Sequence, residues 1–172
     1  MDGAANSDPQ SRRVLVVIDW SVDPDAVAEA VSADTRNEHL AYSLLVPARL
    51  PGLDWVGDPE ASRPCACDQL ERAEASFRRH GLTVMLGRVG DPERLPAILD
   101  LLEESPADEV VIFDRPRRVS FCHALSLVRR LRRKTGLGVH RLTAPLAPAR
   151  SDRRRPFLRR APHCHTAPTA SA

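Results

Sequence analysis

The chain has 172 residues, of which 42% are hydrophobic and only 4% aromatic, so it is long enough for one domain with an aliphatic core. No apolar run approaches the roughly 20 residues that a membrane-spanning helix needs. The first residues, MDGAANSDPQS, lack the basic start and apolar stretch of a signal peptide. These features argue against a membrane protein, and we expect a cytoplasmic protein that does not bind membranes.

The formal net charge of +2 hides two halves of opposite sign. Residues 1–114 contain 22 acidic and 10 basic residues, a net charge of −12, whereas residues 115–172 contain one acidic and 15 basic residues, a net charge of +14. Nucleic acid could bind this basic half, with an affinity that falls steeply with salt. Phe121 and Phe157 are the only Phe, Tyr or Trp residues in this basic half, so the sequence offers few side chains on which bases could stack. We favour a solvated basic helix followed by a basic tail.

The first predicted element is a strand that contains five consecutive apolar residues, Val14 to Ile18. Such a run is typical of a strand that is buried on both faces, as in a parallel sheet. Asp19 ends the strand. A helix follows, with Asp23 placed to cap it and Pro24 at its first position.

The second strand is predicted over 39–47. Residues 47–67 contain several prolines and glycines, and we expect a long loop there that includes Cys65 and Cys67. We interpret this loop as an insertion in the domain. A helix is predicted over 68–81, after the loop.

The second half of the chain continues the alternation of strands and helices. A third strand is predicted over 82–90, and a helix is predicted within 90–106. Asp91 and Pro92 lie at the entry of this helix; the alternative is that the regular helix begins at Pro96, which would break a hydrogen bond in a helix interior. The remaining predicted elements are a strand over 109–113, a helix over 120–136 and a strand over 137–145.

This order predicts an α/β fold, a five-stranded, mostly parallel, Rossmann-like sheet with helices on both faces. We place the domain at 12–144, between a disordered N-terminus, 1–11, and a disordered basic tail, 145–172. In the common strand order 3-2-1-4-5, ligands bind beyond the carboxyl ends of strands 1 and 4. A binding site, if the chain has one, is expected at that edge of the sheet.

Several charged and polar side chains follow these two strands. Arginine side chains there could hold a small anion or the phosphates of a nucleotide, with further donors at the start of the fourth helix. The alternative is that the arginines are solvated or pair with nearby acids. The candidate binding residues are Asp19 and Ser21 after the first strand, Asp114, Arg115, Arg117 and Arg118 after the fourth strand, and Ser120 at the helix start.

Two stretches resemble the universal stress protein family. VLVVIDWSVDPDAVAEAV, residues 14–31, resembles the family's first strand, its acid and the following helix. GRVGDPERLPAILDLLEESPADEVVIF, residues 87–113, resembles its Gly-Asp-Pro helix entry and its fourth strand. The resemblance covers about residues 12–144. It implies a small α/β domain, often a dimer and often able to bind ATP.

The resemblance also indicates what this chain lacks. In ATP-binding members an acid after the first strand contacts adenosine, and Asp19 matches that position. Their phosphates rest on a glycine-rich loop after the fourth strand, where backbone N–H groups can approach them. This chain has no glycine between Gly90 and Gly136. We therefore expect a regulatory or ligand-sensing domain in stress response with weak or no ATP binding, acting as a homodimer or through a protein partner.

Catalytic and metal-binding patterns are weak. Cys122 and His123 are adjacent, but no third group completes a Cys-His mechanism. We expect no catalytic residue, no metal site and no resident cofactor. A metal site would require a loop and the tail to converge, since its candidate ligands are Cys65, Cys67, His163 and His165.

Overall fold

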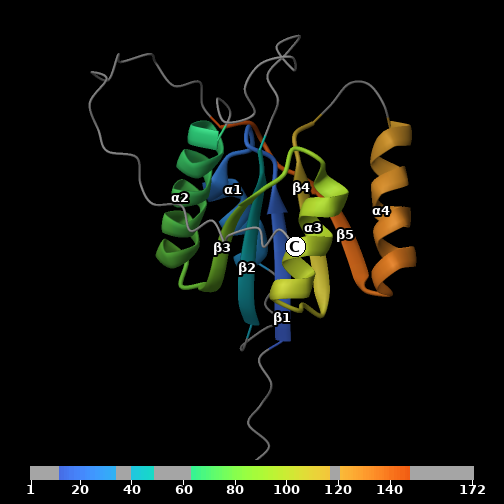
Figure 1. Cartoon of the computed structure of the whole chain (residues 1–172). Coiled ribbons are helices and arrows are strands. Elements are labelled where there is room, and N and C mark those ends of the chain that lie inside the picture. The colour runs from blue at the N-terminus through green and yellow to red at the C-terminus, as the bar shows by residue number, and fades with distance from the viewer. Residues whose placement is uncertain (1–11, 34–39, 49–62, 117–120, 148–172) are drawn as a thin grey trace, which may run out of the picture.

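The computed structural model describes residues 12–33, 40–48, 63–116 and 121–147, which form a sheet with helices on both sides (Figure 1). No helix in these residues is long and apolar enough to cross a membrane. The strands are β1 Arg12–Ile18, β2 Leu40–Pro47, β3 Thr83–Gly90, β4 Glu109–Asp114 and β5 Gly138–Thr143. The helices are α1 Pro24–Ser32, α2 Arg63–Arg79, α3 Arg94–Glu104 and α4 Phe121–Thr135.

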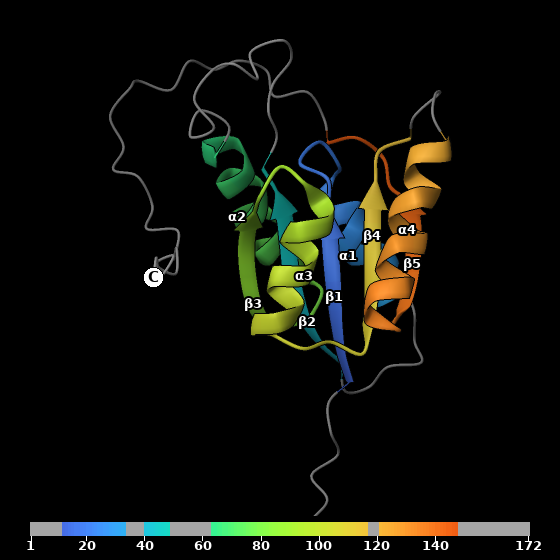
Figure 2. The ribbon, with the colours of Figure 1, turned by 45° about the vertical axis from the view of Figure 1, so that its right-hand side comes forward.

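The sheet has the order β3-β2-β1-β4-β5, and all four strand pairs are parallel. The predicted fold class and strand order are confirmed. Because βαβ crossovers are right-handed, α1 and α2 cover one face of the sheet and α3 and α4 cover the other (Figure 2). The order of connections reverses between β1 and β4, so the carboxyl ends of these two strands mark the switch point.

The apolar run of β1 supplies both cores. Val16 and Ile18 pack with residues of α1 and α2, whereas Leu15 and Val17 pack with Ile98 of α3 and with α4. Side chains alternate between the two faces of a strand, so a strand covered on both faces needs apolar residues at every position. The predicted double burial of this strand is confirmed.

The cap predicted for the first helix is also present. The Asp23 side chain accepts a hydrogen bond from the Asp25 backbone N–H at 3.2 Å, and Pro24 occupies the first helical turn. The chain beyond β5 returns to this region, where Leu146 forms an antiparallel bridge with Val22 and the Ala147 N–H donates to the Ser21 carbonyl. The described structure thus continues past residue 144, and the predicted domain boundaries remain predictions.

The prediction that Cys65 and Cys67 lie in a loop is wrong. They belong to α2, which begins at Arg63. Pro64 lies in the first turn of this helix, where a missing backbone N–H breaks no intrahelical hydrogen bond. Ala66 is 1% exposed and fixes the start of the helix against the core. The rest of the predicted loop, 49–62, lies outside the described residues.

The alternative start of α3 at Pro96 is wrong for the same reason. The helix begins at Arg94, with Glu93 as its N-cap, so Pro96 lies in the first turn. Proline is tolerated there, because the first backbone N–H groups of a helix have no intrahelical partner. The earlier start places Arg94 at the carboxyl edge of the sheet.

Gly90 ends β3 under α3, and we expect its substitution to be destabilising. A Cβ atom at Gly90 would lie 2.8 Å from the Cβ of Ala97 and 2.8 Å from Cδ1 of Leu45. Gly90→Ala should therefore push α3 from the sheet and lower the free energy of unfolding by about 1–3 kcal/mol in urea denaturation. At Gly87 the nearest atom is the end of the Glu74 side chain, which can rotate away, so Gly87→Ala is the control. Equal losses in the two variants would contradict this explanation.

Candidate functional site

Two buried acids meet at the switch point of the sheet. Asp19 follows β1, Asp114 ends β4, and each is 5% exposed. The Asp19 backbone N–H donates to the carbonyl of Phe113 at 3.0 Å, which holds the ends of the two strands together. Two carboxylates buried this close to one another need positive partners to remain ionised.

Arg94 supplies the partner that both acids share. Its Nη2 donates to Oδ2 of Asp19 at 2.6 Å, and its Nη1 donates to Oδ1 of Asp114. Arg141 of β5 donates from Nε to Oδ2 of Asp114 at 2.7 Å. Both arginine side chains are 25% exposed. We call these four residues, Asp19, Arg94, Asp114 and Arg141, the ion-pair cluster; their formal charges cancel.

The second oxygen of Asp19 is also occupied. Oδ1 accepts from the Ser21 hydroxyl at 2.6 Å and from the Ser21 backbone N–H at 3.1 Å. Oδ2 is held by Arg94, so both oxygens of this carboxylate have partners within the chain. A ligand that binds Asp19 must compete with groups that are already bound to it.

The environment of Asp114 fixes its charge. Burial raises the pKa of Asp114, but the charge of Arg94 and the hydrogen bonds from Arg141 and Arg94 outweigh burial, so its pKa lies below the ordinary value of 3.8. Asp114 is therefore ionised at neutral pH and cannot serve as a general acid there.

The structure brings together three of the predicted binding residues, Asp19, Ser21 and Asp114. Arg115 follows Asp114, and its Nε is buried without a hydrogen-bond partner in the described part of the chain. Arg117, Arg118 and Ser120 lie outside the described residues, so their roles remain predictions.

Arg94 and Arg141 were not predicted as site residues, although the sequence contains a signal for each. The first turn of a helix that follows a parallel strand lies at the carboxyl edge of the sheet, and Arg94 is in such a turn. Arg141 pairs in register with Ile112, two residues before Asp114, and alternation puts Arg141 and Asp114 on one face. Both arginines could have been assigned to this edge from their positions alone.

Other candidate groups do not form a site. Cys65 is exposed, Cys67 is half-buried, and neither is in a disulfide. Among the described residues no group of three or more His, Cys, Asp or Glu side chains could hold a metal ion. An apolar pocket lies on the α1 side of the sheet, away from the ion-pair cluster, where Tyr42 and Phe113 contribute to its lining. The histidines His163 and His165 and the side chains of Cys122 and His123 lie outside the described part.

Neither a protein-family model nor a curated protein matches this chain. Solved structures do match it. The universal stress protein from Archaeoglobus fulgidus has a TM-score of 0.52 and 20% identity over 79% of this chain and 93% of that one. A second structure of that protein, in complex with dAMP, has a TM-score of 0.51 and 19% identity over 79% and 98% of the two chains.

Two further matches come from bacteria. A universal stress protein family member from Burkholderia pseudomallei has a TM-score of 0.50 and 21% identity over 77% of this chain and 96% of that one. A class III photolyase from Agrobacterium tumefaciens has a TM-score of 0.52 and 18% identity over 82% of this chain but only 27% of its own length. The sequence resemblance is thus confirmed at the level of the fold: this chain has the five-stranded α/β fold of the universal stress proteins.

Proposed function

We propose that this chain is a cytoplasmic, non-catalytic regulatory or ligand-sensing domain of the universal stress protein type that acts as a homodimer or through a protein partner and binds ATP weakly or not at all. The main support comes from the hydrogen bonds of Asp19. This residue matches the acid that contacts adenosine in ATP-binding members of that family. Both of its carboxylate oxygens are bound by Ser21 and Arg94. The absence of glycine between Gly90 and Gly136 adds support, since no glycine-rich backbone cradle for phosphates follows β4.

The loss of ATP affinity that we expect follows from the burial of the ion-pair cluster. A nucleotide that takes the place of Arg94 on Asp19 would also remove a partner of Asp114. Breaking a buried ion pair costs about 3 kcal/mol or more. Since every 1.4 kcal/mol changes a dissociation constant tenfold, a cost of about 3 kcal/mol weakens binding roughly a hundredfold.

Calorimetric titration with ATP and Mg²⁺ tests this proposal. With such a loss a dissociation constant of about 10 μM would become about 1 mM, so we expect little or no heat of binding at micromolar protein. Arg94→Ala, at a temperature where circular dichroism shows it folded, should bind adenosine more tightly than the wild type. Arg88→Ala is the control, because Arg88 pairs only with Glu104 in the described residues. Micromolar affinity of the wild type for ATP would contradict the proposal.

The second candidate is a true nucleotide-binding stress protein that holds phosphates with arginine side chains. Arg94 and Arg141 lie at the carboxyl edge of the sheet, and Arg115 has a buried Nε without a partner among the described residues. The similar Archaeoglobus fulgidus protein was solved with dAMP. If ATP does bind, replacing Arg117 and Arg118 together by Ala should abolish binding and leave folding nearly intact.

A third alternative is nucleic-acid binding through the basic end of the chain. A deletion should start at residue 148, because Pro145, Leu146 and Ala147 bond to the segment after β1. Loss of oligonucleotide affinity on this deletion would place nucleic-acid binding in residues 148–172. A wild-type protein without oligonucleotide affinity at low salt would exclude this alternative.

A further inference from the structure

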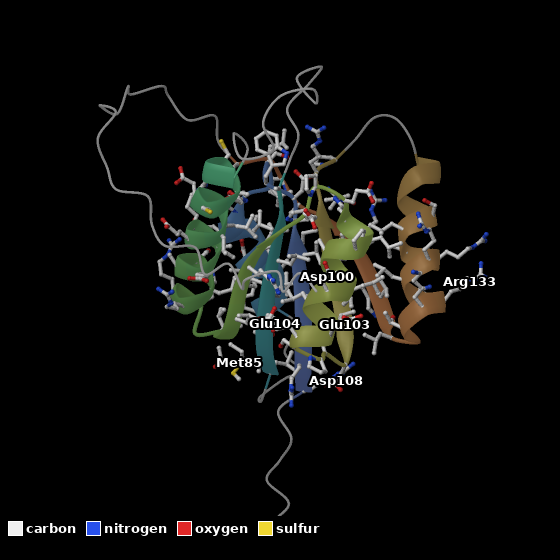
Figure 3. The ribbon with its side chains drawn as sticks, viewed as in Figure 1. Met85, Asp100, Glu103, Glu104, Asp108 and Arg133 are labelled. Atoms are coloured by element: carbon white, nitrogen blue, oxygen red, sulfur yellow. The ribbon has the colours of Figure 1, made fainter. Side chains whose placement is uncertain are left out.

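The two helices on one face of the sheet carry opposite charges. Figure 2 shows α3 and α4 on the same side of the sheet, and Figure 3 shows Asp100 and Glu103 on α3 and Arg133 on α4. Asp100 and Glu103 are exposed, and so are Arg129, Arg130 and Arg133 of α4. Arg129 and Arg133 are four residues apart and therefore lie on one side of their helix.

These charges do not neutralise one another within the chain. None of the five has a hydrogen-bond or ion-pair partner in the part of the chain that the structure describes. Figures 1 and 2 both show α4 standing apart from α3. One face of the molecule thus presents an acidic stripe, Asp100 and Glu103, and a separate basic stripe, Arg129, Arg130 and Arg133.

Apolar side chains accompany both stripes. Leu99 and Leu102 of α3 and Leu127 and Val128 of α4 pack against the core but are only half-buried. Glu104 points toward β3, where it pairs with Arg88. Leu99, five residues earlier, lies about 140° around the helix from Glu104 and so faces away from β3, toward the α4 side. An apolar centre with charged edges is the composition of many protein interfaces.

We propose that this face binds a second copy of the chain. A two-fold axis parallel to the helices, running between α3 and α4, places α3 of each copy over α4 of the other. The acidic stripe of one copy then meets the basic stripe of its partner, twice in one interface. A two-fold axis across the helices would instead stack acid on acid, so the charges select one arrangement. This inference rests on the dimerisation part of the proposed function and identifies its surface.

The distribution of charge favours a second copy over nucleic acid on this face. A polyanion attracted by Arg129 and Arg133 would also approach Asp100 and Glu103, which repel it. A second copy offers each stripe a partner of opposite sign and covers the half-buried leucines at the same time.

Sedimentation velocity with charge-reversed variants tests this interface. The wild type should sediment at twice the 19.0 kDa of one chain. Asp100→Lys with Glu103→Lys makes both stripes positive, and Arg129→Glu with Arg133→Glu makes both negative. Each variant alone should be monomeric. An equimolar mixture of the two should again form dimers, because each positive stripe then meets a negative one.

The mixture also separates a lost interface from a misfolded variant, since only folded chains can restore the dimer. Glu29→Lys with Glu71→Lys is the matched control, because it makes the same charge change on exposed residues of α1 and α2, and this variant should stay dimeric. If both charge-reversed variants still form dimers, the α3/α4 face is not the interface, but the chain does dimerise. A monomeric wild type would contradict both the proposed interface and the proposed dimerisation. Oligonucleotide binding that is lost in Arg129→Glu with Arg133→Glu would instead assign the basic stripe of α4 to nucleic acid. None of these outcomes changes the prediction for ATP.

Discussion

Replacing Arg94 by Met should lower the free energy of unfolding by about 3 kcal/mol, the scale of a broken buried ion pair. Asp19 and Asp114 are each 5% exposed, and among the described residues Arg94 is the one cation that contacts both. Methionine retains much of the apolar stem but leaves Asp19 without a cation among the described residues. Urea denaturation at pH 7 measures the loss.

Two further variants identify the cause of that loss. Arg88→Met removes an arginine whose partner Glu104 is 46% exposed, and this change should cost less than about 1 kcal/mol. Adding Asp19→Asn to Arg94→Met removes the uncompensated charge, while Asp114 keeps its partner Arg141, and should restore part of the stability. Equal losses for the two arginines, or no recovery in the double variant, would show that packing rather than charge explains the effect.

The fold could be predicted because its signals are local. The run from Val14 to Ile18 indicated a strand buried on both faces, and the alternation of strands and helices indicated a parallel sheet. Asp23 and Pro24 marked the start of α1 through the chemistry of a helix cap. Each of these features depends on residues close together in the chain, and the structure confirms them.

The two errors at helix starts came from proline. From the sequence, Pro64 is expected in a loop and Pro96 as an alternative helix start, yet both lie in a first turn, where proline breaks no hydrogen bond. Local sequence does not distinguish a proline at the start of a helix from one that ends a loop. Tertiary contacts such as the burial of Ala66 decide between them.

The site could be located from sequence, but its chemistry could not. Asp19, Ser21 and Asp114 were assigned to the switch point from strand order alone. The partners of the two acids come from α3 and β5, distant in sequence, and long arginine side chains can reach many positions. The positions of Asp19, Ser21 and Asp114 followed from topology, whereas the pairing of the two acids with Arg94 and Arg141 required the placement of side chains.

The ion-pair cluster neutralises two buried acids at the carboxyl edge of the sheet. Asp19 and Asp114 lie at the place where the fold offers a ligand site, and buried carboxylates without partners would be destabilising. Arg94 and Arg141 neutralise them from within the chain. Fold alone does not determine function, and the proposed weak ATP binding rests mainly on these side chains at one edge of the sheet.

The stabilisation that Asp114 provides should depend on pH. Its pKa in the folded protein is below the ordinary value of 3.8, so its contribution is fully present above pH 3.8 and is lost as the pH falls through the lower, folded value. Asp114→Asn lacks this contribution and should be about 2–4 kcal/mol less stable than the wild type at pH 7. The difference should narrow as the pH is lowered toward and below 3, in urea denaturation at each pH.

Comparing the wild type with Asp114→Asn at each pH separates the contribution of Asp114 from that of the other acids. The pKa of Asp25 is also lowered, first by its hydrogen bond from Ser76 and then by the charge of Arg79, but the wild type and Asp114→Asn share that effect. Asp91→Asn, which removes a carboxylate at an exposed position, is the control for the loss of an acidic side chain. A difference for Asp114→Asn that stays constant down to pH 2.5 would mean that Asp114 stabilises the fold by shape and hydrogen bonding. Its negative charge between Arg94 and Arg141 would then contribute nothing.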